Sequence, residues 1–255
     1  MSGFVADFTG AEVRVSPNFG PRREVSRADM IVIHYTGMET GEAAERWLCD
    51  PTSEVSCHYL VHEDGRVVQL VREADRAWHA GRGSWHGASD INSRSIGIEV
   101  VNPGPLAGHP PFAAAQIEAL VTLCRDISSR LDIAKERILA HSDVAPGRKI
   151  DPGPAFPWEQ LHARGIGHLP ARAQSAAIDP IMAGDEGARV ECVQSMLQLY
   201  GYGIEITGHF DAWTKTVVEA FQLHFRRRKV DGVVDSETHA LLTALVSDLP
   251  GLPLG

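Results

Sequence analysis

Three short apolar runs rich in β-branched residues constrain the fold of this chain most strongly. They cover Met30–Gly37, Ser95–Asn102 and Arg137–His141. Their length and composition are typical of buried strands, and the first ends at a glycine while the second is stopped by Pro103. We therefore predict a central sheet that presents polar residues, His34 and His141 among them, at the C-terminal ends of its strands.

Further patterns fill in the elements around these strands. Residues 57–71 hold two β-rich runs around Asp64–Gly65, a dipeptide typical of a two-residue hairpin turn. Residues 41–50 predict a short helix stopped by Pro51, and residues 112–133 place apolar side chains on one helical face. The predicted fold class is α+β, with a mixed central β-sheet flanked by helices and a second, smaller all-α domain of three helices.

The second domain is predicted from a change of character after Trp158. Residues 165–180 are rich in Ala, Pro and Gly with no strong period, which indicates a linker, and three amphipathic helices follow. Asp235 or Ser236 can cap the last helix. The expected organisation is an N-terminal extension at 1–25, a catalytic domain at 26–164, a linker at 165–182 and a three-helix domain at 183–248.

Composition narrows the class of partner. The 255 residues are 44% hydrophobic and 22% charged, with a net charge of -9, which argues against a general nucleic-acid binder. No apolar run approaches the ~20 residues that cross a bilayer. No signal peptide is evident at the N-terminus, so we expect a cytoplasmic protein, with the periplasm or cell envelope as the alternative. The four cysteines form no CxxC pair, which disfavours a zinc ribbon.

The residues 141–153, "HSDVAPGRKIDPG", have the composition of a loop but carry an unusual density of polar chemistry. With His34, the residues His141 and Asp151 make a set of two imidazoles and one carboxylate, which suits a catalytic zinc site with one position left for water. Lys149 is placed to stabilise an oxyanion, and Glu99 on the strand 95–102 can act as a general base.

Simpler interpretations of the same residues stay open at this point. Either histidine can be a surface residue or a hydrogen-bonded core residue. Glu99 can be a strand-edge carboxylate that faces water, and Lys149 a solvated loop charge.

Longer motifs carry a resemblance to a known family. Residues 31–37 "IVIHYTG", 55–81 "VSCHYLVHEDGRVVQLVREADRAWHAG", 95–102 "SIGIEVVN" and 141–158 "HSDVAPGRKIDPGPAFPW" resemble, in this order, the zinc-dependent N-acetylmuramoyl-L-alanine amidases of the T7-lysozyme-like and bacterial recycling type. The resemblance implies a Zn²⁺ enzyme that cleaves the amide between N-acetylmuramic acid and L-alanine in peptidoglycan and muropeptides, including anhydro-muropeptides.

The resemblance also assigns roles to residues. It implies His34, His141 and Asp151 as zinc ligands, and Glu99 and Lys149 as catalytic residues. His79, in "AWHAG", is implied to be structural or substrate-contacting, and Tyr35 is a further substrate-binding candidate. Phage-type members have a tyrosine at the position of Cys57, so this position receives no role.

Residues 184–245 resemble the three-helix peptidoglycan-binding module, through the segments 187–203, 208–222 and 230–242. We expect this module to hold a monomeric enzyme on the wall polymer. The alternatives are a packing or dimerisation domain, and helices that help to shape the catalytic cleft. Two other functions remain as rivals for the whole chain: a non-catalytic peptidoglycan-recognition protein and a phage-type endolysin.

Overall fold

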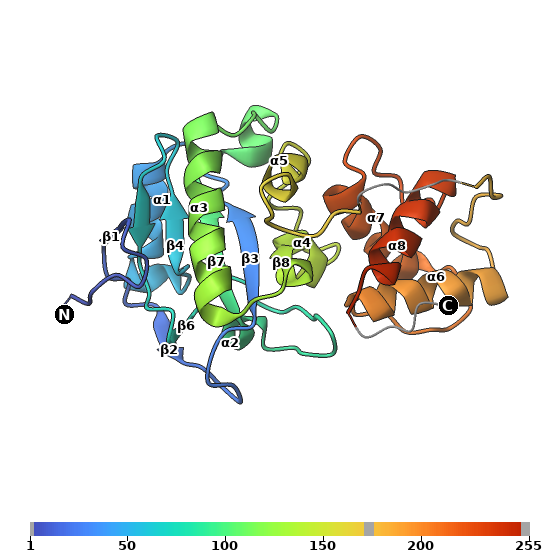
Figure 1. Cartoon of the computed structure of the whole chain (residues 1–255), viewed down its shortest axis with the longest axis horizontal. Helices are drawn as coiled ribbons and strands as arrows, with labels where there is room; N and C mark the ends of the chain where they lie inside the picture. Colours follow the sequence, from blue (N-terminus) through green and yellow to red (C-terminus); the bar gives the residue numbers. More distant parts are fainter. Residues whose placement is uncertain (1–2, 171–175, 251–255) are drawn as a thin grey trace. The chain divides into compact units, whose positions relative to one another are not determined.

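A computed structural model describes residues 3–170 and 176–250 of the chain (Figure 1). The described residues fall into two compact units. The first, called the sheet unit below, comprises residues 3–82, 90–141 and 151–167. The second, called the bundle unit, comprises residues 83–89, 142–150, 168–170 and 176–250. Two short segments that lie within the predicted catalytic domain therefore group with the C-terminal helices, while the exact domain boundaries stay a prediction.

The core of the sheet unit is a six-stranded mixed sheet with the strand order β1-β5-β4-β7-β3-β8. β7, β3 and β8 run parallel to one another, as does β4 to β7, whereas β5 is antiparallel to β4. A separate antiparallel pair joins β2 and β6. The strands are β1 Ala11–Val13, β2 Phe19–Pro21, β3 Met30–Tyr35, β4 Tyr59–Val61, β5 Val67–Gln69, β6 Asp75–Ala77, β7 Ser95–Val100 and β8 Ile138–Ala140.

The parallel strands explain why polar residues collect at one edge of the sheet. In the register of β3 and β7, His34 lies opposite Glu99, and Ile33 of β3 lies opposite Ala140, the last residue of β8. Because the carboxyl ends of parallel strands meet at one edge, His34, Glu99 and His141 are brought together there. The three predicted strands are present, each within one or two residues of its expected bounds.

The predicted hairpin is present, but its turn is longer than expected. Residues 62–66 connect β4 to β5, and the amide of His62 donates to the carbonyl of Arg66 at 2.9 Å. This pair continues the ladder and leaves a three-residue tip, which ends at Gly65 with a φ of +88°. The two-residue turn was therefore wrong: the hairpin uses a glycine in the left-handed region at the end of a longer loop.

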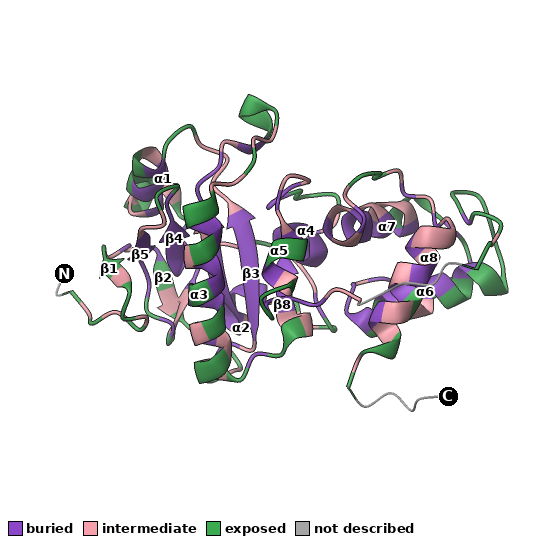
Figure 2. Cartoon of the chain, turned by 45° about the horizontal axis from the view of Figure 1, so that its top comes forward, coloured by how far each residue is buried: buried purple, intermediate pink, exposed green. Residues whose placement is uncertain are grey.

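Helices cover the sheet and complete the sheet unit. In α3 the buried side chains recur along one face, while the opposite face is exposed, and β3 is buried along nearly its whole length (Figure 2). Gln116 of α3 donates to the backbone carbonyls of Val61 and Val101, which ties the helix to the sheet. The helices are α1 Gly41–Leu48, α2 Ile91–Arg94, α3 Ala114–Leu131 and α5 Trp158–His162, with short 3₁₀ turns at Pro51–Ser53, Gly104–Ala107 and Lys135–Arg137.

The segment that was predicted to be a loop, residues 141–153, begins instead with the short helix α4, His141–Val144. Residues 142–145 are buried, although the sequence offers few apolar side chains there. The composition of the segment did not predict this burial, because the carboxylate of Asp143 is hydrogen-bonded to residues far away in the sequence. These hydrogen bonds allow the carboxylate to be buried.

The bundle unit contains the three predicted helices, α6 Ala188–Tyr200, α7 Ala212–Phe225 and α8 Ser236–Ser247. Asp211 caps α7 by accepting from the amide of Thr214, and Asp235 caps α8 in the same way through Thr238. The predicted fold class, a mixed sheet with helices plus a small helical domain, is confirmed. Residues 171–175 of the predicted linker lie outside the described residues. Among the helices described, none is long and apolar enough to span a membrane.

Candidate metal centre

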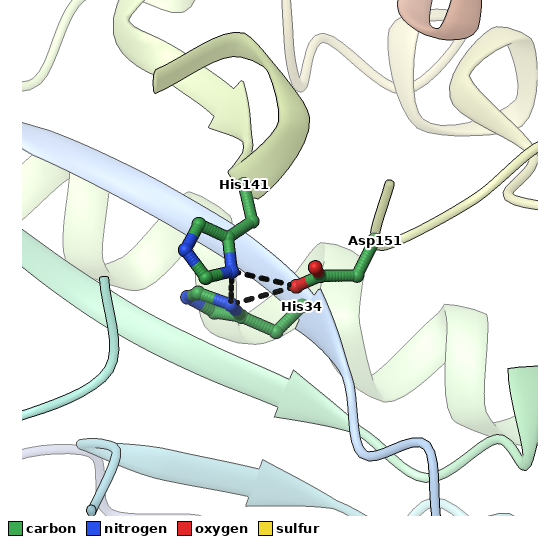
Figure 3. A group of neighbouring side chains, drawn as sticks. All are labelled: His34, His141 and Asp151. Atoms are coloured by element: carbon green, nitrogen blue, oxygen red, sulfur yellow. Dashed lines mark hydrogen bonds and ion pairs between the residues drawn. The ribbon is translucent and has the colours of Figure 1, made fainter. Parts of the chain in front are cut away.

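Two histidines and one aspartate converge at the edge of the sheet. His34 comes from β3, His141 directly follows β8, and Asp151 lies ten residues further along the chain (Figure 3). His34 Nδ1, His141 Nδ1 and Asp151 Oδ2 are each 2.9 Å from the other two. All three side chains are buried, and among the described residues they form the one group of this kind that could hold a metal ion. The structure thus brings together the three residues predicted as ligands.

A chain of hydrogen bonds sets which nitrogen of His34 faces the cluster. The Ser95 hydroxyl donates to the carbonyl of Ile91 at 2.6 Å, so it accepts from His79 Nε2 at 3.1 Å. His79 Nδ1 is then the acceptor for the Nε2–H of His34, at 3.0 Å. The remaining nitrogen of His34, Nδ1, therefore presents its lone pair to His141 and Asp151.

His141 is oriented in the same way by the backbone. Its Nε2–H donates to the carbonyl oxygen of Ala80 at 2.9 Å, which leaves Nδ1 as the acceptor that faces the cluster. The side chain of Asn92 holds this backbone in place, because its Oδ1 accepts from the amides of His79 and Ala80 at 3.0 and 2.8 Å. Partners of this kind are typical of metal-binding histidines, whose second ring nitrogen is hydrogen-bonded to a carbonyl or another side chain.

The short distances among three hydrogen-bond acceptors indicate whether the cluster suits a metal ion. Two imidazole lone pairs and a carboxylate oxygen at 2.9 Å repel one another unless a cation is shared among them. One carboxylate with two imidazoles is a donor set of catalytic zinc sites. The residues present therefore fit a divalent cation.

Glu99 stands beside the cluster on the same face of the sheet. It is the register partner of His34 in the adjacent strand, and side chains of directly paired residues point to the same face. The side chain is half-buried, at the end of a strand that is otherwise buried. Burial, reinforced by the charges of Asp151 and Glu99, raises the pKa of Tyr35 to about 12.

His79 packs so closely on the sheet that it restricts the residue beneath it. A Cβ at position 97 of β7 would lie 2.4 Å from Cγ of the His79 ring. Burial, together with the neighbouring histidines, lowers the pKa of His79 well below its usual value, which keeps the ring neutral and able to accept from His34. His79 thus contacts the side chain of His34, one of the proposed ligands, directly.

Lys149 is the one proposed catalytic residue outside the sheet unit. It belongs to residues 142–150 of the bundle unit, and its side chain is exposed. Its backbone amide donates to the carbonyl of Ala145 at 3.1 Å. Its assignment rests on its position two residues before Asp151 in the chain.

Sequence reasoning missed the groups that support the ligands. Ser95 and Gly97 act on the cluster through His79, and Asn92 acts through the backbone of His79 and Ala80. None of the three stood out from the pattern of its own segment. The small residue inside the apolar strand "SIGIEVV" was the available signal, because glycine within a strand often marks close approach by another group.

A buried cluster of two histidines and one aspartate, beside a glutamate near a strand end on a mixed sheet, is typical of metal-dependent hydrolases. Comparison with protein families makes the assignment specific. The model described as N-acetylmuramoyl-L-alanine amidase matches residues 24–154, and the chain belongs to this family. A second model, described as "Putative peptidoglycan binding domain", matches residues 186–242.

Curated relatives agree with this assignment. The N-acetylmuramoyl-L-alanine amidase AmiD of Escherichia coli K12 is 39% identical over 235 residues, which cover 86% of this chain and 83% of the relative. The 1,6-anhydro-N-acetylmuramyl-L-alanine amidase AmpD of Enterobacter cloacae is 34% identical over 165 residues, covering 58% of this chain and 86% of the relative. The similarity to AmiD therefore spans both parts of the chain.

Two solved structures with bound compounds are similar to this one. The complex of E. coli AmiD with the substrate anhydro-N-acetylmuramic acid-L-Ala-D-gamma-Glu-L-Lys has a TM-score of 0.74 and 36% identity, and covers 92% of each chain. AmpDh3 of Pseudomonas aeruginosa in complex with anhydromuramic pentapeptide has a TM-score of 0.70 and 31% identity, and covers 91% of this chain and 94% of that one.

Proposed function

We propose that this protein is a zinc amidase that hydrolyses the amide between the lactyl group of N-acetylmuramic acid and L-alanine, in peptidoglycan and in anhydro-muropeptides. The observation that carries the proposal is the buried cluster of His34, His141 and Asp151 in a chain of the amidase family. The muropeptide complexes of AmiD and AmpDh3 support the class of substrate.

His34, His141 and Asp151 would hold the zinc ion. Zinc supplies Lewis acidity, which polarises an amide carbonyl and lowers the pKa of water from 15.7 to about 7. Glu99 takes a proton from the attacking water and later delivers it to the amine of L-alanine as the carbon–nitrogen bond breaks. Lys149 stabilises the negative oxygen that develops on the carbonyl. His79 and Ser95 keep His34 in the tautomer that binds a cation.

The bundle unit would bind the wall polymer through the module at residues 186–242. Attachment to a polymer raises the local concentration of the scissile bonds without changing the chemistry. A non-catalytic recognition protein is disfavoured because His34, Glu99, His141 and Asp151 are all retained. Similarity to AmiD along both parts of the chain favours a bacterial wall amidase over a phage-type endolysin.

The direct test is mass spectrometry of products from a soluble anhydro-muropeptide and from purified sacculi. We expect the full chain loaded with zinc to release a stem peptide with a free L-alanine amino terminus from both substrates. Dialysis against a chelator should remove this activity, and added zinc should restore it. Cleavage at another bond, or release of the same peptide by the metal-free protein, would contradict the proposal.

A further inference from the structure

The residues between two of the proposed ligands belong to the bundle unit. Ser142 directly follows His141, and Ile150 directly precedes Asp151, so the segment 142–150 is covalently fixed to a ligand at each end. Within the described residues, this segment groups with the three C-terminal helices and not with the sheet. Its own packing therefore depends on residues far along the chain.

A buried carboxylate makes this dependence specific. Asp143 is fully buried, and the Tyr202 hydroxyl donates to its Oδ1 at 2.7 Å. On the other oxygen, Oδ2, it accepts from His224 Nδ1 at 2.7 Å. Tyr202 and His224 are buried as well. A carboxylate removed from water is tolerated only when such donors replace its hydration, so the two donors hold Asp143 in place.

Close backbone packing adds to these bonds. A Cβ at Gly147, whose φ is +72°, would lie 2.7 Å from Cγ2 of Thr216 on α7. The amide of Ser84 donates to the carbonyl of Val144 at 2.8 Å, which joins the second small segment of the bundle unit to the first. That second segment is anchored by Trp85, which is fully buried with its ring centroid 5.0 Å from that of Tyr202.

We propose that Tyr202 and His224 are positioning residues for the amidase reaction: through Asp143 they hold the segment 142–150, and with it Lys149, in its working conformation. This inference rests on the proposed function, in which Lys149 takes part in catalysis. It gives the bundle a second role beside binding the polymer. The helices act on the turnover of every substrate, soluble muropeptides included, and not on wall polymer alone.

The test uses full-chain variants. Tyr202→Phe removes the donated hydrogen bond and keeps the ring, and His224→Gln is the second variant. Tyr200→Phe is the matched control, because Tyr200 is also buried in the bundle unit and its hydroxyl lies 3.1 Å from His168 Nδ1. Two readouts are needed: trypsin cleavage after the exposed Arg148 and Lys149, and kcat and KM on a soluble anhydro-muropeptide.

We expect Tyr202→Phe to raise the cleavage rate roughly tenfold, because a lost bond to a charged group makes local opening easier. The value of kcat should fall while KM changes little. Lys149→Ala should cost less in the Tyr202→Phe background than in the parent, because both changes act on one group. Tyr200→Phe should change neither readout.

Cleavage as slow in Tyr202→Phe and His224→Gln as in the parent would overturn the proposal, as would equal acceleration by Tyr200→Phe. Faster cleavage with unchanged kcat, or strictly additive effects with Lys149→Ala, would overturn the link to catalysis. If the parent protein hydrolyses no muropeptide, the proposed function fails. In that case the cleavage rates alone decide whether Tyr202 and His224 hold the segment.

Discussion

His34 and the segment 142–150 are both needed for the proposed reaction, but different parts of the molecule hold them. His34 is fixed by its strand, by His79 and by Ser95, all within the sheet unit. The segment that follows His141 is fixed by Tyr202 and His224 of the bundle unit. The proposed metal-binding residue His34 and the segment that carries Lys149 therefore have separate hydrogen-bonded supports, and we expect substitutions in one support to leave the other function intact.

The largest effect should follow from His34→Ala. Loss of a ligand should abolish activity and lower the zinc content, while the fold is largely kept because an open catalytic site is not a folding core. His209→Ala is a suitable control, since His209 is an exposed histidine whose Nδ1 lies 3.1 Å from Oε1 of Glu186. Zinc analysis and circular dichroism check the result. Full zinc content with full turnover in His34→Ala would show that the ligand assignment is wrong.

Glu99→Gln should separate chemistry from metal binding. The amide keeps the shape of the side chain but accepts no proton, so the rate should fall by about 10²–10⁴ while zinc stays bound. Steady-state kinetics at saturating zinc measure the change, with Glu42→Gln on the exposed face of α1 as the control. An unchanged rate would remove Glu99 from the mechanism.

Lys149→Ala should give a somewhat smaller loss of rate, on the order of 10²–10³, because it removes one stabilising group for the oxyanion. Zinc affinity should stay at the parent level, since Lys149 contributes no ligand atom. Lys135→Ala removes another exposed lysine and should leave the rate unchanged. If zinc binding falls together with the rate, Lys149 supports the metal site and does not act in catalysis.

Of these four substitutions, Gly97→Ala should have the smallest effect. It should act only through residues of the sheet unit. The added Cβ would displace the His79 ring, so zinc affinity should fall by ~10–100-fold, as for other lost partners of metal ligands. Overpacking should also lower the free energy of unfolding by about 1–3 kcal/mol. Gly20→Ala is the matched control, because a Cβ at this position would have no atom within 4 Å. Competition with a chelating dye measures the affinity, and equal affinity in both variants would contradict the role of His79.

The strands of the sheet unit and the polar residues near their ends are well predicted, because the sequence signals for them are local. A run of β-branched residues indicates the strand, and a histidine or glutamate near its end indicates the edge where ligands gather. His79 was harder to assign, since its role depends on Ser95 and Gly97 in another segment. The hydrogen-bond chain that sets its tautomer becomes visible only when β7 is in place.

The three helices of the bundle unit could be predicted from their sequence, but the burial of Asp143 could not be predicted from the residues around it. Asp143 sits in a polar, turn-rich stretch that looks solvated, yet its partners Tyr202 and His224 are 59 and 81 residues away in the chain. Periodicity and composition report on neighbours in sequence, so they give no sign that this carboxylate is buried. The monomeric state and the cytoplasmic location stay predictions.

The separation of the two supports is the central claim, and zinc affinity in two single variants tests it most directly. Ser95→Ala removes the acceptor for His79, and Tyr202→Phe removes a donor to Asp143. Chelator competition at one pH should show zinc bound ~10–100-fold more weakly by Ser95→Ala and as tightly as in the parent by Tyr202→Phe. Equal weakening in both variants, or weakening in Tyr202→Phe alone, would contradict the account.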